Sequence, residues 1–321
     1  MIRNRLLVAI PLVFASTILI FLAVSVAGDP LDRYRQPNVP QSTLDAKAHE
    51  LGLDQPLIER YWTWVTGAFQ GDFGLNVRGV PVSQELLDRA IVSFRLVALA
   101  IVLAVVIAVV VGFLSAVNRG RPLDRLLTIV TVLLLTAPEF WIAVVSKQAA
   151  IKVNETAGST VIATVGDSTP GVAEMPWPTR ISDYAAHLVL PTIVLVLAIF
   201  PVWALYQRSA MLEVIDTDYV TMARAKGLSR RRVMVKHGLR NALMPLITMI
   251  ALRLPWVIGG LVVVESIFGW RGLGTMLVEG VQQQDTNTVL AFLLLSAVLI
   301  TILNLAADVA HRILDPRMTH D

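Results

Sequence analysis

The chain has 321 residues, of which 55% are hydrophobic and only 16% are charged. Soluble domains carry about 25% charged residues, so this composition indicates an integral membrane protein. A net charge of +3 is compatible with a nucleic-acid partner, but the basic residues gather beside apolar segments, where membrane topology explains them better. The absence of cysteine excludes disulfides, thiolate nucleophiles and cysteine-ligated metals.

The first apolar segment covers residues 6–27 and follows Arg3 and Arg5. Its end resembles a signal-peptide cleavage site, but a signal h-region usually has about 7–15 residues. A run of 22 uncharged residues is long enough to cross about 30 Å of hydrocarbon. We therefore expect an uncleaved transmembrane helix within residues 1–28.

Residues 29–90 are polar and are expected to form a small external subdomain. Its aromatic group, Tyr61, Trp62 and Trp64, is suited either to the core of that subdomain or to the membrane interface. Residues 91–311 contain five further apolar segments, and residues 312–321 form a polar tail. The five segments cover residues 96–117, 126–145, 188–206, 242–264 and 288–307.

The distribution of basic residues predicts the orientation of the six segments. The N-terminus, residues 118–125, residues 207–240 and the C-terminus together hold fifteen Lys and Arg residues. Short basic segments stay in the cytoplasm. The sequence thus predicts an all-α membrane protein with six transmembrane helices, both termini in the cytoplasm, and a second external segment at residues 146–187.

The basic segment at residues 207–240 also contains residues that typically begin and end helices. Asp218 is suited to begin a short helix that ends near Lys226, and Gly227 is suited to the left-handed position that follows a helix. Ser229 is suited to begin a second helix that runs toward Leu239. Charge alone indicates a solvated cytoplasmic loop, whereas two helices around a glycine turn indicate a surface that docks against a partner.

Spacing also predicts which side chains of the first helix share a face. Tyr219, Met222 and Ala223 recur at the i, i+3, i+4 positions of a helix.

Three charged residues fall in or beside apolar segments: Glu139, Arg253 and Glu265. A charge at mid-membrane costs about 2.5–3.5 kcal/mol on insertion scales, so Arg253 is expected to face a bundle interior or a wet cavity. One interpretation places all three on a translocation path or at its gate, where Arg253 meets a substrate carboxylate or Glu139. The alternatives are a pair with a neighbouring subunit, or a position nearer the interface for Arg253 and for Glu139.

No motif of an enzyme is present. The sequence lacks the GxxxxGK[ST] phosphate loop, the HExxH zinc motif and the GxSxG nucleophile elbow. Its five histidines have no metal-ligand spacing. We therefore expect neither catalytic residues nor a metal or cofactor in this chain.

Several stretches, in order along the chain, resemble the permease subunits of bacterial ABC importers, and most of all the peptide/nickel permease family. The loop stretches ARAKGL and HGLRNALMP resemble the EAA loop of these permeases, although Thr221-Met222-Ala223 stands where the motif has Glu-Ala-Ala. Leu239-Arg240 replaces its Leu-Pro end, and Arg271 replaces a common proline. The other stretches are LGLDQP at 51–56, GDFG at 71–74, PEFW at 138–141, GLVVVESIF at 260–268, GLG at 272–274, QD at 284–285, and Asn304, Asp308 and LDPR at 314–317.

The resemblance implies the permease subunit of an ATP-driven importer, most like the first permease subunit of an oligopeptide system. Its implied partners are a second permease subunit, two ATPase subunits that hold ATP and Mg²⁺, an extracytoplasmic peptide-binding protein and membrane lipid, with no nucleic acid. Residues 219–228 are implied to form the coupling helix that contacts an ATPase. The implied coupling residues are Tyr219, Met222, Ala223, Arg224, Ala225, Lys226, Gly227 and Leu228.

Two alternatives remain open from the sequence. An importer of the same build can carry dipeptides, nickel or glutathione. A membrane anchor or sensor that does not transport can use the basic loop to recruit a signalling partner.

Overall fold

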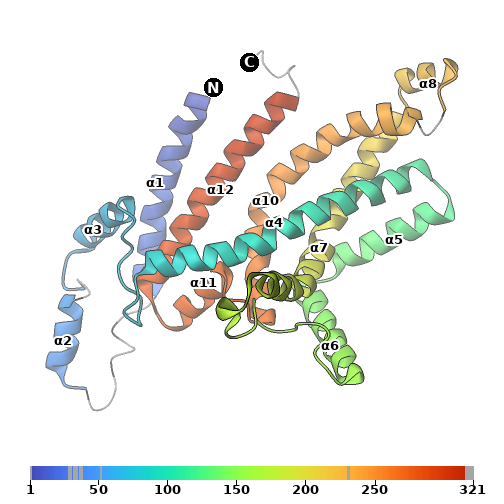
Figure 1. Cartoon of the computed structure of the whole chain (residues 1–321). Helices are drawn as coiled ribbons and strands as arrows, with labels where there is room; N and C mark the ends of the chain where they lie inside the picture. The colour runs from blue at the N-terminus through green and yellow to red at the C-terminus, as the bar shows by residue number, and fades with distance from the viewer. Residues whose placement is uncertain are drawn as a thin grey trace. The chain divides into compact units, whose positions relative to one another are not determined.

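The computed structural model describes residues 2–27, 31, 35, 39–50, 53–229 and 232–314. Throughout these residues the regular elements are helices, and a single isolated bridge joins Leu75 to Pro81 (Figure 1). The chain divides into two compact units, residues 1–93 with 271–302 and residues 94–270 with 303–321. The 51–52 and 315–317 parts of the family-like stretches, and most of the predicted tail, lie outside the described residues.

The first unit combines the N-terminal third of the chain with a segment near its C-terminus. Its helices are α1 (Ile2–Ala27), α2 (Gln41–Glu50), α3 (Leu57–Phe69), α11 (Leu273–Gln282), the start of α4 (Val82–Val117) and most of α12 (Thr286–Leu314).

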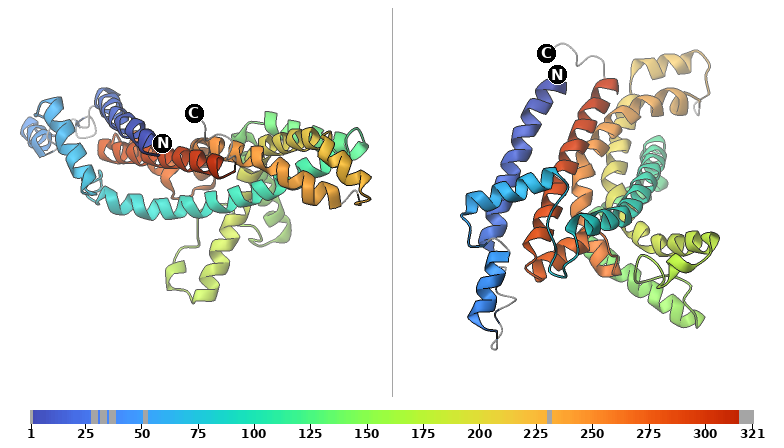
Figure 2. Two further views of the ribbon diagram at one scale, coloured as in Figure 1. Left: turned by 90° about the horizontal axis from the view of Figure 1, so that it is seen from above. Right: turned by 60° about the vertical axis from the view of Figure 1, so that its left-hand side comes forward.

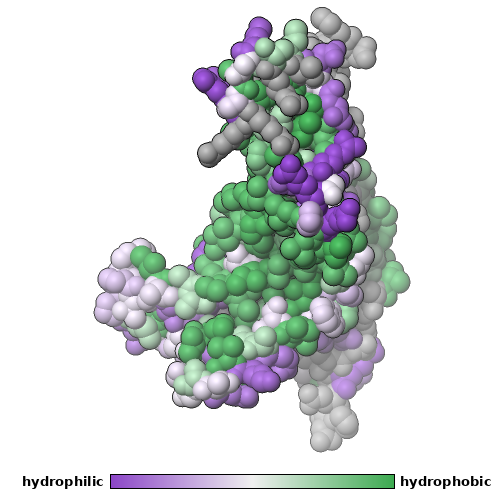
Figure 3. All heavy atoms as spheres, turned by 90° about the vertical axis from the view of Figure 1, so that its right-hand side faces the viewer, coloured by the Kyte–Doolittle hydropathy of each residue, from purple (hydrophilic) through white to green (hydrophobic). Residues whose placement is uncertain are grey.

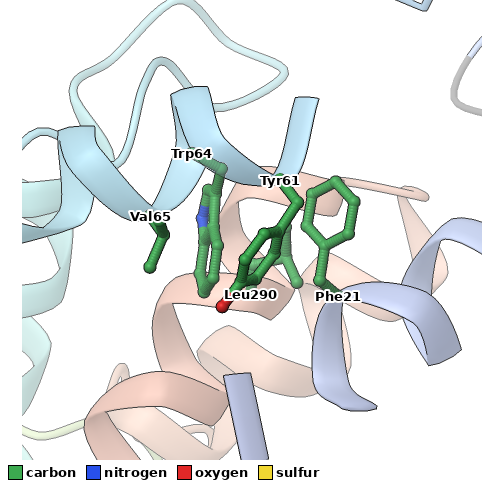
Figure 4. Close-up of a cluster of buried hydrophobic side chains, with 5 residues drawn as sticks. All are labelled: Phe21, Tyr61, Trp64, Val65 and Leu290. Atoms are coloured by element: carbon green, nitrogen blue, oxygen red, sulfur yellow. The ribbon is translucent and has the colours of Figure 1, made fainter. Parts of the chain in front are cut away.

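An aromatic core joins α1, α3 and α12 in this unit. Phe21, Tyr61, Trp64, Val65 and Leu290 are buried together (Figure 4). The Tyr61 hydroxyl lies 2.9 Å from Thr17 Oγ1, so its polar end is satisfied within the core. Trp62 is 51% exposed. The aromatic group of the sequence therefore divides, with Tyr61 and Trp64 in the core and Trp62 on the surface.

The loop before α4 is held against the start of α12. The Asp285 carboxylate accepts a hydrogen bond from the backbone N–H of Val77 at 2.8 Å, and Asn287 donates to the Leu75 carbonyl at 2.9 Å. Arg89 of α4 donates to Glu85 and to Glu279 of α11, both at 2.6 Å. Ionic and backbone contacts thus join residues nearly 200 positions apart in the chain.

The second unit is built around α7 (Trp177–Ile215). This helix packs against α5 (Pro122–Thr136), α6 (Glu139–Ala157) and α10 (Arg240–Phe268), and α10 also packs against α6 (Figures 1 and 2). The 3₁₀ turn η2 (Val172–Glu174), the π-helical segment η3 (Val233–Leu239) and α8 (Asp218–Ala225) complete the unit. The predicted external segment at residues 146–187 begins within α6 and ends within α7. Residues 158–176 connect these two helices.

A glycine sets the close approach of α4 to α7. A Cβ at Gly112 would lie 2.7 Å from the Ala204 carbonyl oxygen and 2.7 Å from Gln207 Cβ. Only glycine therefore fits this crossing without a shift of one helix.

Helix lengths and apolar surfaces agree with a membrane protein. Among the described residues, three helices are long and apolar enough to cross a bilayer, or five if each of two bent helix pairs is one span. The predicted segment 126–145 is one such pair, because α5 and α6 meet at 104° around Pro138. Figure 3 shows hydrophobic side chains over a broad face on the side of the molecule where Figure 1 places α5.

Candidate coupling helix and membrane pocket

The first candidate site is α8, which lies between α7 and η3 in the chain. The helix begins at Asp218 and ends at Ala225, where the Lys226 N–H donates to the Met222 carbonyl at 3.0 Å. Gly227 then has φ of +82°. This left-handed conformation ends the helix, as the sequence predicts, and it is costly for any residue with a Cβ.

One face of α8 packs against its own chain. Val220 is 2% exposed and clusters with Val233 and Met234 of η3, and the partly buried Ala223 and Leu228 pack on this cluster. These contacts hold one face of α8 against η3.

The opposite face of α8 is open. Met222 is 62% exposed, and Ala225, Lys226 and Gly227 are also exposed. The prediction that Met222 and Ala223 share a face is wrong, because Ala223 points inward with Val220. The side chains of Tyr219 and Arg224 lie outside the described residues.

The second predicted helix of the loop does not end near Leu239. From Val233 to Leu239 it is π-helical, and it then continues directly into α10. π-Helical segments are rare and often occur at functional sites. The surface on which α8 rests is therefore continuous with a membrane helix, so a force on α8 reaches α10 without an intervening loop.

A buried carboxylate joins three helices of the second unit, α4, α5 and α7. Asp124 of α5 is 4% exposed and accepts hydrogen bonds from Arg208 of α7, with Nε at 2.9 Å and Nη2 at 3.0 Å. Ser115 of α4 and the backbone N–H of Gly120 also donate to it. We call these four residues the Asp124 cluster. A bidentate guanidinium pair is the strongest and most directional ion pair available to a protein.

Sequence reasoning missed the Asp124 cluster. Arg208 was counted only as one of the basic residues that set topology, and Asp124 was not singled out. The single available signal is an acid in an otherwise basic loop, and it does not identify a partner 84 residues away.

The second candidate site is a membrane pocket of about 150 Å³ between α6, α7 and α10. It brings together Glu139, the first residue of α6, and Arg253 of α10, the two charges that one interpretation of the sequence places close to each other. Arg253 is thirteen residues into α10, or about 20 Å along it. We call this site the charged pocket; its apolar lining is Leu195, Ala198, Ile199, Val202, Trp203 and Val257.

The two charged groups of this pocket differ in environment. Glu139 Oε1 is buried and has no hydrogen-bond partner within the described part of the chain. Arg253 is exposed. The third predicted path residue, Glu265, does not line the pocket; it is fully buried in the last turn of α10.

The fold is similar to that of a chain in a solved transporter structure. The inward-facing MetNI methionine ABC transporter contains a chain that superposes with a TM-score of 0.55 at 18% identity, over 72% of this chain and 96% of that one. The helices described above therefore have the fold of an ABC transporter permease.

The sequence identifies the family. Residues 108–320 match the family model of the binding-protein-dependent transport system inner membrane component, and the chain belongs to this family. It is a multi-pass inner-membrane permease and not an enzyme.

Curated relatives are similar over nearly their whole length. The oligopeptide transport system permease protein OppB of Mycobacterium bovis is 40% identical over 98% of this chain and 97% of its own. AppB, an oligopeptide transport system permease protein of Bacillus subtilis, is 36% identical over 99% and 98%. The glutathione transport system permease protein GsiC of Escherichia coli strain K12 is 33% identical over 99% and 98%.

Proposed function

We propose that this chain is a permease subunit of an oligopeptide importer and that α8 couples it to an ATPase subunit. The observation that carries the coupling role is the two-sided packing of α8. Its inner face is held by η3, while Met222, Ala225 and Lys226 remain open to a partner. The peptide substrate is supported by the oligopeptide systems to which OppB and AppB belong.

The proposed mechanism needs a rigid connection between the ATPase and the membrane helices. When ATP closes the ATPase pair, α8 moves with the subunit that holds it, and η3 passes the movement directly to α10. The Asp124 cluster keeps the ends of α4, α5 and α7 together, so the helices rotate as a body instead of separating. The path opens and closes between this chain and a second permease subunit.

The proposed assembly contains this chain, a second permease, two ATPase subunits that bind ATP and Mg²⁺, and an extracytoplasmic peptide-binding protein. Six transmembrane helices with both termini in the cytoplasm place α8 on the ATPase side. In this orientation the segments at residues 29–90 and 146–187 face the binding protein.

Gly227→Val tests the coupling role. A left-handed conformation costs a residue with a Cβ about 1–2 kcal/mol, so valine distorts the turn that ends α8. Within the described part of the chain no atom lies within 4 Å of a Cβ placed there, so we expect the change to act on the backbone and not by a clash. In a reconstituted complex we expect ATP hydrolysis to continue while peptide uptake falls.

Gly227→Asn is the matched control. Asparagine visits the left-handed region much more readily than valine, so it adds a side chain at the same place, where φ is +82°, with little distortion of the turn. We expect uptake by this variant to stay near the wild-type rate. Normal uptake by Gly227→Val, or an equal loss in both variants, contradicts the coupling role.

Glutathione is a second candidate substrate because GsiC aligns over nearly the whole chain. Glutathione is itself a small peptide with free carboxylates. Competition between labelled oligopeptide and glutathione for ATP-dependent uptake separates the two substrates.

A further inference from the structure

We propose that the charged pocket binds the carboxylate end of the transported peptide, with Arg253 on the carboxylate and Glu139 on the adjacent backbone N–H. This inference rests on the proposed function and adds to it a substrate-binding site within the membrane path.

The pocket presents two opposite charges on apolar walls. Arg253 supplies a planar guanidinium that matches a carboxylate with two parallel hydrogen bonds. A charged group in an apolar segment of a membrane protein is expensive and in most proteins marks a pathway or a paired site. An anionic ligand therefore suits Arg253 better than an apolar one.

Glu139 adds a second requirement. Its Oε1 is buried without a hydrogen-bond partner among the described residues, and a buried acceptor left unsatisfied is destabilising. A ligand that fills the pocket must therefore bring a hydrogen-bond donor as well as an anion. The last residue of a peptide carries both on neighbouring atoms, the carboxylate and its own amide N–H.

The remaining surface fits the side chain of that last residue. Ile199 and Val202 of α7 and Val257 of α10 line the pocket with hydrocarbon. A volume of about 150 Å³ is enough for one residue and too small for a whole oligopeptide. The rest of the peptide must extend out of the pocket, which agrees with a site that holds one end of chains of different length.

The test compares a peptide that has a free C-terminal carboxylate with the same peptide as its C-terminal amide. Uptake into proteoliposomes is measured for the complete transporter, and the affinity of the binding protein for each peptide is measured separately. After correction for that affinity, we expect wild type to prefer the free acid by at least about tenfold in kcat/KM. In Arg253→Gln the preference should fall to near one.

Three further variants keep the test decisive. Arg253→Lys retains the charge and should retain much of the preference, so it serves if Arg253→Gln does not assemble. Glu139→Gln keeps an acceptor oxygen but removes its charge, so the hydrogen bond from the peptide N–H weakens and kcat/KM should fall for both peptides. Arg125→Gln removes an exposed positive charge of α5 outside the pocket and should leave the preference unchanged.

The inference and the proposed function fail in different ways. If wild type takes up neither peptide with ATP, the proposed function fails. If wild type prefers the free acid and Arg253→Gln retains this preference, the pocket does not recognise the carboxylate. An equal loss of uptake for both peptides in Arg253→Gln also overturns the inference, since it indicates a pair with a neighbouring subunit.

Discussion

Removal of the Asp124 carboxylate is the perturbation whose size the structure defines best. In Asp124→Ala, Arg208 loses both of its carboxylate hydrogen bonds, at 2.9 and 3.0 Å. The N–H of Gly120 loses its acceptor as well. The variant thus leaves the Arg208 cation with only the Ser115 hydroxyl, 3.0 Å from Nε, and it leaves the Gly120 N–H without its acceptor, at the junction of three helices.

The expected loss is about 3 kcal/mol. Breaking a buried ion pair by removal of one partner costs about 3–5 kcal/mol, because the remaining charge is left without compensation. The lower end applies here, because the Arg208 side chain is 28% exposed and water can solvate part of it. The side chain of Asp124 is only 6% exposed, so its own contribution is not reduced by solvent.

The assay is the midpoint of thermal unfolding of the purified complex, with a double-mutant cycle over Asp124→Ala and Arg208→Met. Because the double variant leaves no unpaired charge, its loss of stability should be clearly smaller than the sum of the two single losses. The matched control is Arg119→Gln, which breaks an exposed pair with Asp216 at 3.4 Å. That pair has side chains 63% and 69% exposed and should contribute less than about 1 kcal/mol.

Two results refute this reasoning. If Asp124→Ala unfolds within the range of the Arg119→Gln control, the cluster does not hold the helices together. If the single losses are large but strictly additive, the two residues stabilise the protein separately and not as a pair.

Three further predictions concern other parts of the chain. Gly112→Ala places a Cβ against the α7 backbone and should lower the free energy of unfolding by about 1–3 kcal/mol, which is measured as a lower thermal midpoint. Arg89→Met leaves two carboxylates facing each other and should cost about 3 kcal/mol, whereas Arg78→Met, with a side chain 56% exposed, should cost less than about 1 kcal/mol. The hydrogen bond to Asp54 raises the pKa of His49 above 6.5, so this contact stabilises the fold at low pH and is lost as pH rises through that raised value; an NMR titration should show the shift vanish in Asp54→Asn.

Local signals in the sequence predicted the elements that depend on local physics. Long apolar runs indicated the membrane helices, and Asp218 and Gly227 marked α8 to within a residue because helix ends follow from backbone conformation. Pro138 lies within the predicted segment 126–145, and α6 begins directly after it because proline ends or bends a helix. The 104° angle was not predictable, because it depends on the packing of α6 against α7 and α10.

Long-range packing decided the remaining features. Val220 and Met222 are both apolar, and spacing alone does not tell which of them faces the chain itself and which faces outward. The pairing of Asp124 with Arg208 arises from the crossing of α5 and α7, which the sequence does not encode locally. Glu139 and Arg253 each stood out as charges in apolar segments, and the structure brings them into one pocket.

The orientation of α8 gives the most direct test of the coupling role. Because the chain has no cysteine, single cysteines at Met222 and Val220 can be cross-linked without interference. Met222 is 62% exposed and Val220 is 2% exposed, on opposite faces of the same helix. In the assembled transporter we expect Met222→Cys to cross-link to an ATPase subunit, with a yield that changes when ATP is added, and Val220→Cys not to cross-link. Failure of Met222→Cys to cross-link, or equal yields from the two positions, would contradict the proposal that α8 is the coupling helix.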